Sequence, residues 1–157
     1  MVIDYSQTIN KFMQLDANPL PRMQDVVNSV VQYKNFSTLD LTSAYHQIEL
    51  PPTDRIYTAF QADGSLWQWK RILFGLTNAA PCFQRIVDYL IKRTNCEGTF
   101  AYLDNITIGG CTQEEHDRNL HKVLEAARNC NLTLTAQNVF SRRTRLICWV
   151  IESLKVV

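Results

Sequence analysis

The spacing of hydrophobic side chains along the chain predicts three amphipathic helices. Apolar residues at positions i, i+3, i+4 and i+7 lie on one face of a helix with 3.6 residues per turn. The three apolar stripes are Met23, Val26, Val27, Val30 and Val31; Phe83, Ile86, Val87, Leu90 and Ile91; and Leu120, Val123, Leu124 and Ala127. Pro21 and Pro81 suit the first turns of the first two helices, and the first helix should end near Tyr33. Thr112 and Glu115 have the spacing of a capping box, which predicts the start of the third helix.

Shorter apolar runs between the helices predict strands. These runs are residues 36–41, 57–60, 66–69, 99–110, 132–134 and 145–151. Asp63-Gly64 separates the second run from the third and is a strong signal for a tight hairpin turn. The run 99–110 is typical of a second hairpin, with its tip at residues 103–106. Helices interleaved with antiparallel hairpins predict an α+β fold.

Two of the predicted strands each contain one aspartate. Asp40 lies in the run 36–41, and Asp104 follows the apolar residues 100–103 at the tip of the second hairpin. An unpaired carboxylate in an apolar strand is costly, so it normally neutralises, binds a cation, or sits where the strand opens to solvent. Either aspartate alone fits an ordinary strand-end or turn residue. Two of them side by side would form an oxygen-rich site suited to Mg²⁺ and to two-metal phosphoryl transfer.

The composition is that of one folded domain without an overall charge bias. The chain has 157 residues, 46% of them hydrophobic, and a formal net charge of +1. Bulk charge therefore gives no argument for nucleic acid, and any basic surface must be local. Candidates are Lys70-Arg71, Lys92-Arg93, and Arg142-Arg143 with Arg145. Short basic clusters of this kind are more often solvated surface than binding sites.

The cysteines and histidines favour a reduced, intracellular protein. The five cysteines form no Cys-x-x-Cys pair, and no secretory apolar segment opens the chain. We therefore expect a cytoplasmic or nuclear location rather than secretion. His116 and His121 are five residues apart and share a helical face poorly, which disfavours a zinc site. No apolar run approaches the roughly 20 residues that a membrane span requires, so we expect no membrane partner.

Five segments follow one another in an order that one protein family has. They are residues 2–5 with 19–22, 39–48, 74–85, 102–105 and 132–152. In this order they resemble the fingers and palm of reverse transcriptases, RNA-directed DNA polymerases, of gypsy-type long-terminal-repeat retrotransposons. The resemblance implies a single domain with a polymerase palm-like antiparallel sheet packed against helices and a partial fingers region. Residues 1–36 and 51–75 would be fingers-like, and residues 37–50 and 76–157 palm-like.

The resemblance assigns the two aspartates to metal binding and catalysis. Asp40 and Asp104 match the residues that hold both metal ions in the family. The backbone carbonyl of Leu41 would be an additional oxygen ligand. The implied cofactor is Mg²⁺ or Mn²⁺, with two ions expected when substrate is bound.

Three further positions match the family's nucleotide-binding residues. Tyr45 matches the steric gate, an aromatic ring that leaves no room for a 2′-hydroxyl group; its alternative role is that of a core tyrosine. Phe74 and Gly75 match the positions that flank the incoming nucleotide, although Gly75 also fits an ordinary turn. His46 and Gln47 are assigned to structure rather than to chemistry.

Template and primer contacts fall on other residues. Gln84 and Arg85 lie on the predicted helix after Pro81, where template contact and simple exposure are both open. Tyr102 would pack near the primer terminus or fill the hairpin, and the sequence does not separate these roles.

Four positions depart from the family pattern. The second aspartate of the family's Tyr-x-Asp-Asp turn is Asn105, which removes a charge beside the metals but suits a tight turn. Gln137 stands near the place of a lysine that serves as general acid for the pyrophosphate leaving group, and glutamine cannot supply that proton. The closing strand has Ile147-Cys148 instead of Leu-Gly, and the central helix has Ala80-Pro81 instead of Pro-Ala.

Two functional interpretations follow. The first is a reverse-transcriptase domain fragment of a retroelement polyprotein, which would bind an RNA or DNA template-primer and deoxynucleoside triphosphates. Thumb and ribonuclease H regions would then act in trans, and apolar surface left by their loss would favour self-association. The second is a catalytically inactive, domesticated or decaying copy that serves as a nucleic-acid or protein interaction module. Asn105 and Gln137 favour the second, whereas Asp40, Asp104 and Tyr45 favour the first.

Overall fold

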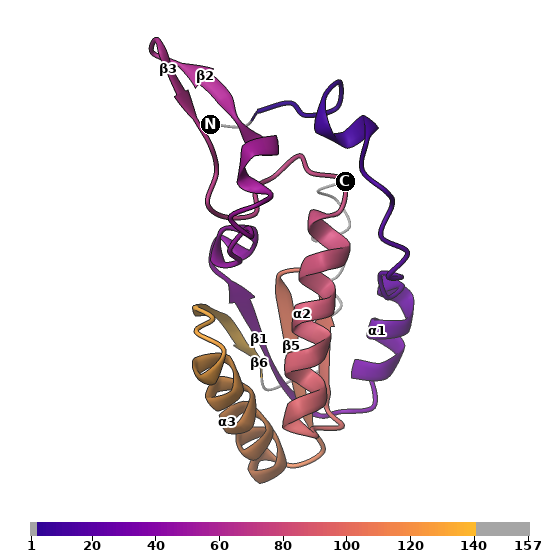
Figure 1. Ribbon diagram of the computed structural model, residues 1–157. Helices are drawn as coiled ribbons and strands as arrows, with labels where there is room; N and C mark the ends of the chain where they lie inside the picture. Colours follow the sequence, from indigo (N-terminus) through magenta and orange to yellow (C-terminus); the bar gives the residue numbers. More distant parts are fainter. Residues whose placement is uncertain (1–2, 141–157) are drawn as a thin grey trace. The chain divides into compact units, whose positions relative to one another are not determined.

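The structure is a computed structural model that describes residues 3–140, the last six of them by their backbone (Figure 1). The predicted strand at 145–151, the cluster of Arg142, Arg143 and Arg145, and the Ile147-Cys148 pair lie outside the described residues. The chain divides into two compact units. The first unit consists of Met1–Pro19 and Ser43–Arg85, and the second of Leu20–Thr42 and Ile86–Val157. The boundaries between fingers-like and palm-like segments stay a prediction.

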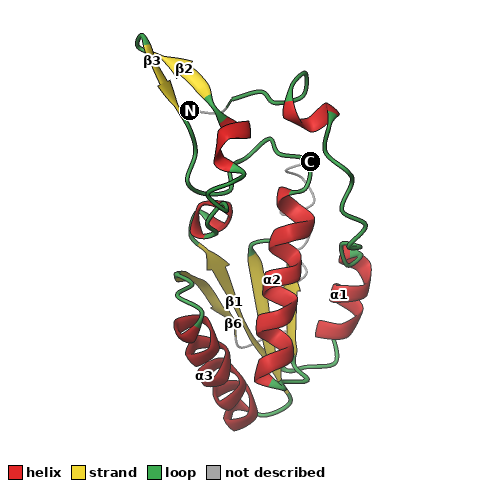
Figure 2. Ribbon diagram, viewed as in Figure 1, coloured by secondary structure: helices red, strands yellow, loops and turns green. Residues whose placement is uncertain are grey.

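An antiparallel sheet forms the centre of the second unit. Its strands are β1 (Asn35–Leu41), β4 (Thr99–Tyr102), β5 (Asn105–Gly110) and β6 (Leu134–Phe140), in the order β4-β5-β1-β6. Both neighbours of β1, β5 and β6, are antiparallel to it. The hairpin predicted at 99–110 is thereby confirmed, and the strand predicted at 132–134 begins at Leu134. Strands and helices together make the α+β fold expected from the sequence (Figure 2).

β1 is buried along most of its length because it lies between two partner strands. Phe36, Leu39 and Leu41 are core residues, and Ile106 and Ile108 of β5 are fully buried beside them. An alternation of polar and apolar residues is therefore absent from this strand, as expected for a strand covered on both faces. Its polar residues are buried as well, and Asp40 near the strand's end is only partly exposed. Asp40 therefore lies near the end of β1, at a partly exposed position of an otherwise buried strand.

Two helices of the second unit pack on this sheet. α1 (Met23–Val30) contacts β4, and α3 (Gln113–Asn129) contacts β5 and β1. The predicted first helix is confirmed, but it ends at Val30, before Tyr33. Arg22 is its N-cap residue, so Pro21 precedes the helix instead of occupying its first turn.

The start of α3 has the predicted capping arrangement with one change. The backbone N–H of Glu115 donates to Oγ1 of Thr112 over 3.2 Å. The Glu115 carboxylate accepts from the N–H of Cys111 over 2.8 Å, one residue before the N-cap. The helix therefore begins where the sequence predicts, and two backbone donors that would lack helical partners are satisfied.

The inward face of α3 differs from the predicted apolar stripe. Its buried residues are His116, Asn119, Val123 and Ala127, whereas Leu124 is 42% exposed. Asn119 donates to the carbonyl of Gly109 over 3.0 Å, so this polar residue is satisfied inside the unit. A Cβ atom at Gly110 would collide with the backbone of His116, which explains how closely β5 approaches the helix. The hydrophobic pattern missed this face because two of its members are polar.

α2 (Ala79–Thr94) confirms the second predicted helix and places Pro81 in its first turn. Phe83, Val87 and Leu90 of its predicted stripe are fully or almost fully buried. Pro81 is tolerated there because the first-turn N–H groups have no intrahelical acceptors. No helix within residues 3–140 is long and apolar enough to cross a membrane.

The first unit has its own small core. Its buried apolar residues are Tyr5, Ile72, Leu73, Leu76 and Ala79. The Tyr5 hydroxyl donates to the carbonyl of Thr58 over 2.9 Å, which links two segments 53 positions apart in the sequence. Burial raises the pKa of Tyr5, so the phenol remains protonated and keeps donating. Short helices of this unit are η1 (Ile9–Lys11), η2 (Ala44–Gln47) and η3 (Arg55–Thr58).

The hairpin predicted at Asp63-Gly64 is confirmed, with shifted strand limits. β2 (Phe60–Ala62) and β3 (Ser65–Trp67) pair across Asp63 and Gly64, whose φ angles are 51° and 72°. Positive φ at both turn residues is typical of a type I′ turn, which suits Asp-Gly. Residues 57 and 58 belong to η3 rather than to a strand. The Thr58 hydroxyl donates back to the carbonyl of Arg55 over 2.7 Å, a local bond that competes with strand pairing.

Candidate active site

The sheet of the second unit brings the two aspartates to neighbouring strands. Asp40 of β1 lies directly opposite Asn105 of β5, and Asp104 immediately precedes Asn105. The backbone N–H of Leu41 donates to the carbonyl of Asp104 over 2.8 Å. The pairing of β1 with β5 therefore confirms that segments 64 positions apart in the sequence lie side by side in the sheet.

The turn between β4 and β5 exposes Asp104. Tyr102 and Asn105 pair as the last residues of their strands, which leaves Leu103 and Asp104 as the two turn residues. Turn propensity predicts the left-handed backbone conformation at Asn105, but Leu103 adopts it, with φ at 51°. A left-handed conformation costs a residue with a side chain about 1–2 kcal/mol. The turn thus holds the Asp104 carboxylate on the exposed side of an otherwise buried hairpin.

The Asn105 side chain donates a hydrogen bond to Asp104, and its amide oxygen has no hydrogen-bond partner among the described residues. Its Nδ2 donates to Oδ1 of Asp104 over 3.2 Å. An amide can contact a carboxylate favourably only through its NH₂ group, so its oxygen must face elsewhere. That oxygen, Oδ1, is buried and has no hydrogen-bond partner among the described residues. A buried acceptor without a donor is costly, and such atoms in folded proteins call for a water or an ion.

The oxygen atoms gathered here suit a hard divalent cation. Within residues 3–140 no group of three or more His, Cys, Asp or Glu side chains could hold a metal ion. The oxygen-bearing groups in this part of the sheet are two carboxylates, the buried Asn105 amide oxygen and the Leu41 carbonyl. Mg²⁺ sites of this type use one or two carboxylates and take their remaining oxygens from water and substrate phosphates. The residues present therefore fit Mg²⁺ or Mn²⁺ when a phosphate-bearing substrate completes the coordination.

The predicted nucleotide-binding residues come together in the first unit. Tyr45, in η2, meets Phe74 edge-on, with ring centroids 4.9 Å apart and an interplanar angle of 90°. Its ring also meets Phe83 at 5.5 Å. Tyr45 is half-buried, while Phe74 is 48% exposed. Both interpretations of Tyr45 keep support, because its ring packs on one side and remains partly accessible.

Gly75 occupies a position that only glycine fits well. Its φ is 93°, and a Cβ atom there would lie 3.2 Å from the carbonyl oxygen of Ile3. The Gly75 carbonyl accepts from Nδ2 of Asn10 over 2.7 Å. His46 has the structural role expected for it, because its ring stacks on Trp69 at 6.0 Å and contacts the Ile72 carbonyl at 3.1 Å through Nδ1.

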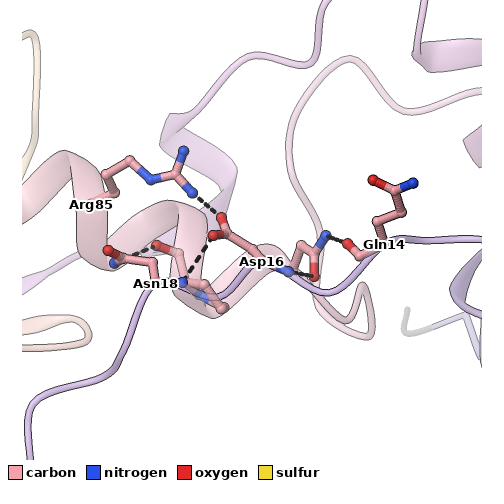
Figure 3. A network of polar contacts seen from close by, with 6 residues as sticks. Gln14, Asp16, Asn18 and Arg85 are labelled. Atoms are coloured by element: carbon pink, nitrogen blue, oxygen red, sulfur yellow. Dashed lines mark hydrogen bonds and ion pairs between the residues drawn. The ribbon is translucent and has the colours of Figure 1, made fainter.

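The residues assigned to the template occupy different environments. Gln84 is fully buried on α2, so of its two open roles simple exposure is wrong, and template contact would require its side chain to become accessible. The apolar stripe did not predict the burial of Gln84, because a polar residue at that position indicates the exposed face of the helix. Arg85 is more exposed, but its guanidinium forms an ion pair with Asp16 (Figure 3).

The Arg85–Asp16 ion pair belongs to a local network in the first unit. The Asp16 carboxylate also accepts from the N–H of Asn18 over 3.1 Å. Asn78 accepts from the N–H of Asp16 over 3.1 Å and donates to the carbonyl of Gln14 over 2.6 Å. The network attaches residues 14–18 to the start of α2 (Figure 3). Arg85 is therefore held by protein contacts, which supports a structural role for it.

The remaining predicted residues lie at the sheet. Tyr102 ends β4 opposite Asn105 and is half-buried, so both of its predicted roles stay open. Gln137 lies in β6 where the register with β1 shifts between Thr38 and Leu39. Only the backbone of Gln137 is among the described atoms.

A buried hydrogen-bonded series in the second unit was not found by sequence reasoning. The Ser37 side chain lies 2.9 Å from Nε2 of His116, and Nδ1 of His116 lies 2.9 Å from Oδ1 of Asp117. Serine, histidine and aspartate in this order resemble a hydrolase triad. Ser37 is only 1% and His116 only 2% exposed, so no substrate reaches the hydroxyl group. The series instead links the start of α3 to β1.

The cysteine nearest to the nucleotide-binding positions does not have a nucleophile's environment. Burial raises the pKa of Cys82, and Asp16 adds to this effect, while Arg85 opposes it less strongly than burial acts. The side chain is therefore a thiol rather than a thiolate near neutral pH. Covalent catalysis by Cys82 is disfavoured on this ground.

Comparison with known proteins identifies relatives over most of the chain. Residues 2–139 match the family described as Reverse transcriptase (RNA-dependent DNA polymerase). The retrovirus-related Pol polyprotein from transposon 412 of Drosophila melanogaster is 37% identical over 134 residues, which are 85% of this chain and 11% of that protein. The corresponding polyprotein from transposon gypsy of the same organism is 31% identical over 137 residues, 87% of this chain and 13% of that protein. The chain thus spans a small part of these relatives.

The similar solved structures are also reverse transcriptases. The foamy viral protease-reverse transcriptase in a complex with double-stranded DNA has a TM-score of 0.80 and 25% identity, covering 91% of this chain and 25% of that one. The same enzyme in a complex with an RNA/DNA hybrid has a TM-score of 0.80 and 25% identity, covering 90% and 19%. Both the sequence match and the fold therefore extend over the sheet that carries Asp40 and Asp104.

Proposed function

Because this chain belongs to the reverse transcriptase (RNA-dependent DNA polymerase) family, as a domain of long-terminal-repeat retrotransposon type, we propose that it catalyses templated nucleotidyl transfer by a two-metal mechanism. The observation that carries the proposal is the register that sets Asp40 beside Asn105 and Asp104. One carboxylate in β1 and one in the turn before the adjacent β5 would concentrate negative charge where divalent cations would bind. The family membership supports the same chemistry.

Asp40 and Asp104 would hold the metal ions, with the carbonyl of Leu41 as a further ligand. Bound ions would stabilise the attacking and leaving oxygens of an in-line displacement. The role of the protein is to fix the donor atoms beforehand, which avoids reorganisation during the reaction. Asn105 would contribute by holding the Asp104 carboxylate through its Nδ2.

Nucleotide selection is assigned to Tyr45, Phe74 and Gly75. We propose that the ring of Tyr45 excludes a 2′-hydroxyl group and that the exposed ring of Phe74 packs on the nucleotide. The 90° contact between the two rings supports this, because each restricts the other's orientation. The left-handed Gly75 leaves backbone without a Cβ next to Phe74.

The proposed partners are an RNA or DNA template-primer and deoxynucleoside triphosphates. Related enzymes have been solved with double-stranded DNA and with an RNA/DNA hybrid. Of the local basic residues on this chain, Arg71 is paired with Glu49 at 3.1 Å and also donates to the carbonyl of Gln47. Lys70 is exposed beside it and is the better candidate for a phosphate contact. The chain spans a small part of its relatives, and we propose that polymerase regions outside the matched part also take part in binding, supplied in trans in the test below.

A second candidate function is an interaction module without catalytic activity. The observation in its favour is Asn105, which leaves the site two carboxylates instead of three. Gln137 adds to it, because glutamine cannot protonate a leaving group. Such a module would bind template-primer without extending it.

Metal titration followed by primer extension distinguishes the two functions. We expect Mn²⁺ to bind in the presence of nucleotide and primer, and an RNA-templated primer to be extended when thumb and ribonuclease H regions are added as a separate chain. Asp40→Asn should abolish both results. Metal binding without extension would favour the interaction module, and extension by Asp40→Asn would exclude Asp40 as a metal ligand.

A further inference from the structure

The first unit contains a cavity of about 390 Å³ that the proposed polymerase chemistry leaves unused. Small-molecule sites in proteins typically have volumes of about 300–1,000 Å³. Three stretches of the unit form its walls: η1 with the residues after it, the segment that contains η3, and Leu76. The lining residues are Ile9, Phe12, Met13, Leu50, Asp54, Tyr57, Thr58 and Leu76.

The interior of this cavity is apolar because its buried polar residue is already satisfied. The Thr58 hydroxyl donates to the carbonyl of Arg55 over 2.7 Å and accepts from the N–H of Trp69 over 3.0 Å. The Thr58 carbonyl accepts from the hydroxyl of Tyr5 over 2.9 Å. The other deeply buried lining residue is Leu76. A ligand therefore finds hydrocarbon here and few open hydrogen-bonding groups, which favours an apolar body.

Three of the lining residues are exposed: Phe12, Tyr57 and Asp54. Phe12 is 86% exposed and Tyr57 is 67% exposed, large values for apolar side chains next to a cavity. Asp54 is the only charged side chain among the lining residues. Its carboxylate accepts from the hydroxyl of Thr53 over 2.9 Å, and its N–H donates to the carbonyl of Pro51 over 2.9 Å. Asp54 is thus held in place by its neighbours.

The lining residues include no basic side chain. Arg55, which follows Asp54 in the sequence, donates through its Nε to the carbonyl of Leu50 over 3.0 Å, so part of its guanidinium is held at the backbone. An acidic group beside aromatic rings attracts a cation by charge and by the negative faces of the rings.

We propose that this cavity binds a small organic ammonium ion with an aliphatic or aromatic body. The body would lie against Met13, Leu50 and Leu76, and the ammonium group would lie at the opening between the Asp54 carboxylate and the aromatic rings. Met13 is unbranched and can adapt to the shape of the body. This site is independent of the metal-binding aspartates.

The test uses three ligands that differ in charge and share a phenylalkyl body: 2-phenylethylammonium, 2-phenylethanol and 3-phenylpropanoate. Each is titrated into the isotopically labelled full chain, and the amide signals of residues 9–13 and 50–58 are followed by NMR. We expect saturable shifts, with the ammonium binding about threefold more tightly than the alcohol and the carboxylate more weakly than both. An exposed charge pair contributes modestly, which sets the size of this preference.

Three variants distinguish the effect of the Asp54 charge on ligand binding from the effect of the cavity volume. Asp54→Asn keeps the shape of the side chain and should remove the preference for the ammonium. Asp63→Asn is the matched control, an exposed aspartate in the hairpin turn with φ at 51°, where asparagine is tolerated. It should leave the preference unchanged. Met13→Trp should fill the cavity and weaken all three ligands.

A salt titration of the parent protein tests the proposal without a variant that could misfold. Raising NaCl from about 50 mM to about 500 mM should reduce the affinity of the ammonium toward that of the alcohol, because salt screens an exposed charge. Binding of the alcohol should not weaken. The proposal is overturned by an absence of saturable shifts, by equal affinities for the three ligands, or by a preference that survives in Asp54→Asn.

Discussion

Leu103 has a backbone conformation that residues with side chains rarely adopt, and it stands next to the exposed catalytic candidate Asp104. Strain of this kind persists only where surrounding contacts determine it. Here the pairing of Tyr102 with Asn105 closes the turn, and the bond from Leu41 to the Asp104 carbonyl attaches it to β1. At the scale of single residues, the site therefore depends on a turn whose conformation the neighbouring strands impose.

Replacing Asn105 by aspartate should strengthen divalent metal binding. The change converts a neutral amide oxygen into a carboxylate beside Asp104, and a third negative charge increases attraction for Mn²⁺. It also removes the Nδ2 donor to Asp104, so without metal the two carboxylates should repel each other. Calorimetric titration with Mn²⁺ should show tighter binding for Asn105→Asp than for the parent and weaker binding for Asn105→Ala. Equal affinities for all three proteins would contradict a role for residue 105 at the metals.

Replacing Tyr45 by alanine should relax sugar selection. We expect ribonucleotide use relative to deoxyribonucleotide use to rise at least about tenfold, equivalent to about 1.4 kcal/mol of transition-state binding. Steady-state incorporation of matched nucleotides measures this ratio once extension is detected. Tyr45→Phe is the control and should change the ratio little, because the ring makes the gate.

The packing of Tyr45 on Phe74 and Phe83 supplies the competing expectation. If Tyr45 is only a core residue, its truncation lowers the melting temperature and reduces the use of both sugars equally. An unchanged ratio together with lower stability would therefore reject the gate assignment.

At the scale of elements, α3 and β1 are joined by the series from Ser37 through His116 to Asp117. Asp117 is on the exposed side, whereas the other two residues are buried. A hydrogen bond from His116, and then one from Gln113, lower the pKa of Asp117 below its ordinary value. The helix start is thus supported by the capping bonds of Thr112 and Glu115 and by this link to the sheet.

The lowered pKa of Asp117 predicts a pH-dependent contribution to stability. A carboxyl group with a folded-state pKa below its unfolded value stabilises the fold above the unfolded pKa, about 3.9 for aspartate, and loses this effect as pH falls through the folded pKa. Urea unfolding of the parent and Asp117→Asn should therefore differ near pH 6. The difference should shrink as pH falls below about 4. The hydrogen-bond link between Asp117 and His116 would be contradicted if the difference in unfolding free energy between the parent and Asp117→Asn stayed constant down to the folded-state pKa of Asp117.

At the scale of the whole molecule, the near-neutral charge limits how nucleic acid can bind. The net charge of +1 gives no long-range attraction for phosphates, so the proposed binding would depend on local groups such as Lys70. Each phosphate that a basic side chain neutralises contributes about −0.9 to the slope of log K against log salt for B-DNA.

Template-primer binding should accordingly show a shallow salt dependence. We expect a slope of about −2 to −4, corresponding to a few phosphate contacts. Lys70→Gln should make the slope less negative by roughly one. Lys34→Gln, an exposed lysine of the other unit, serves as the comparison and should leave it unchanged. Fluorescence anisotropy with a labelled hybrid at several salt concentrations measures both slopes, and identical slopes for the parent and Lys70→Gln would exclude Lys70 as a phosphate contact.

The sequence by itself determined the features that depend on local order. Periodic apolar residues located the three helices, and Asp63-Gly64 located a hairpin. These features follow from backbone geometry and turn chemistry within about ten residues, so a linear pattern contains them. The α+β class follows from the same patterns, whereas the family was implied by the resemblance of five ordered motifs and is shown by the comparisons.

Only the tertiary structure decided which polar residues are buried and which turn residue is strained. Gln84 and His116 are buried polar residues that hydrophobic periodicity counts as exposed, because their burial depends on distant partners such as Ser37. Leu103 takes the left-handed conformation because the pairing of β4 with β5 places the turn there, whereas local propensity favours Asn105. The cavity beside Asp54 likewise requires segments that are remote in sequence. Long-range contacts set these features, and no local pattern encodes them.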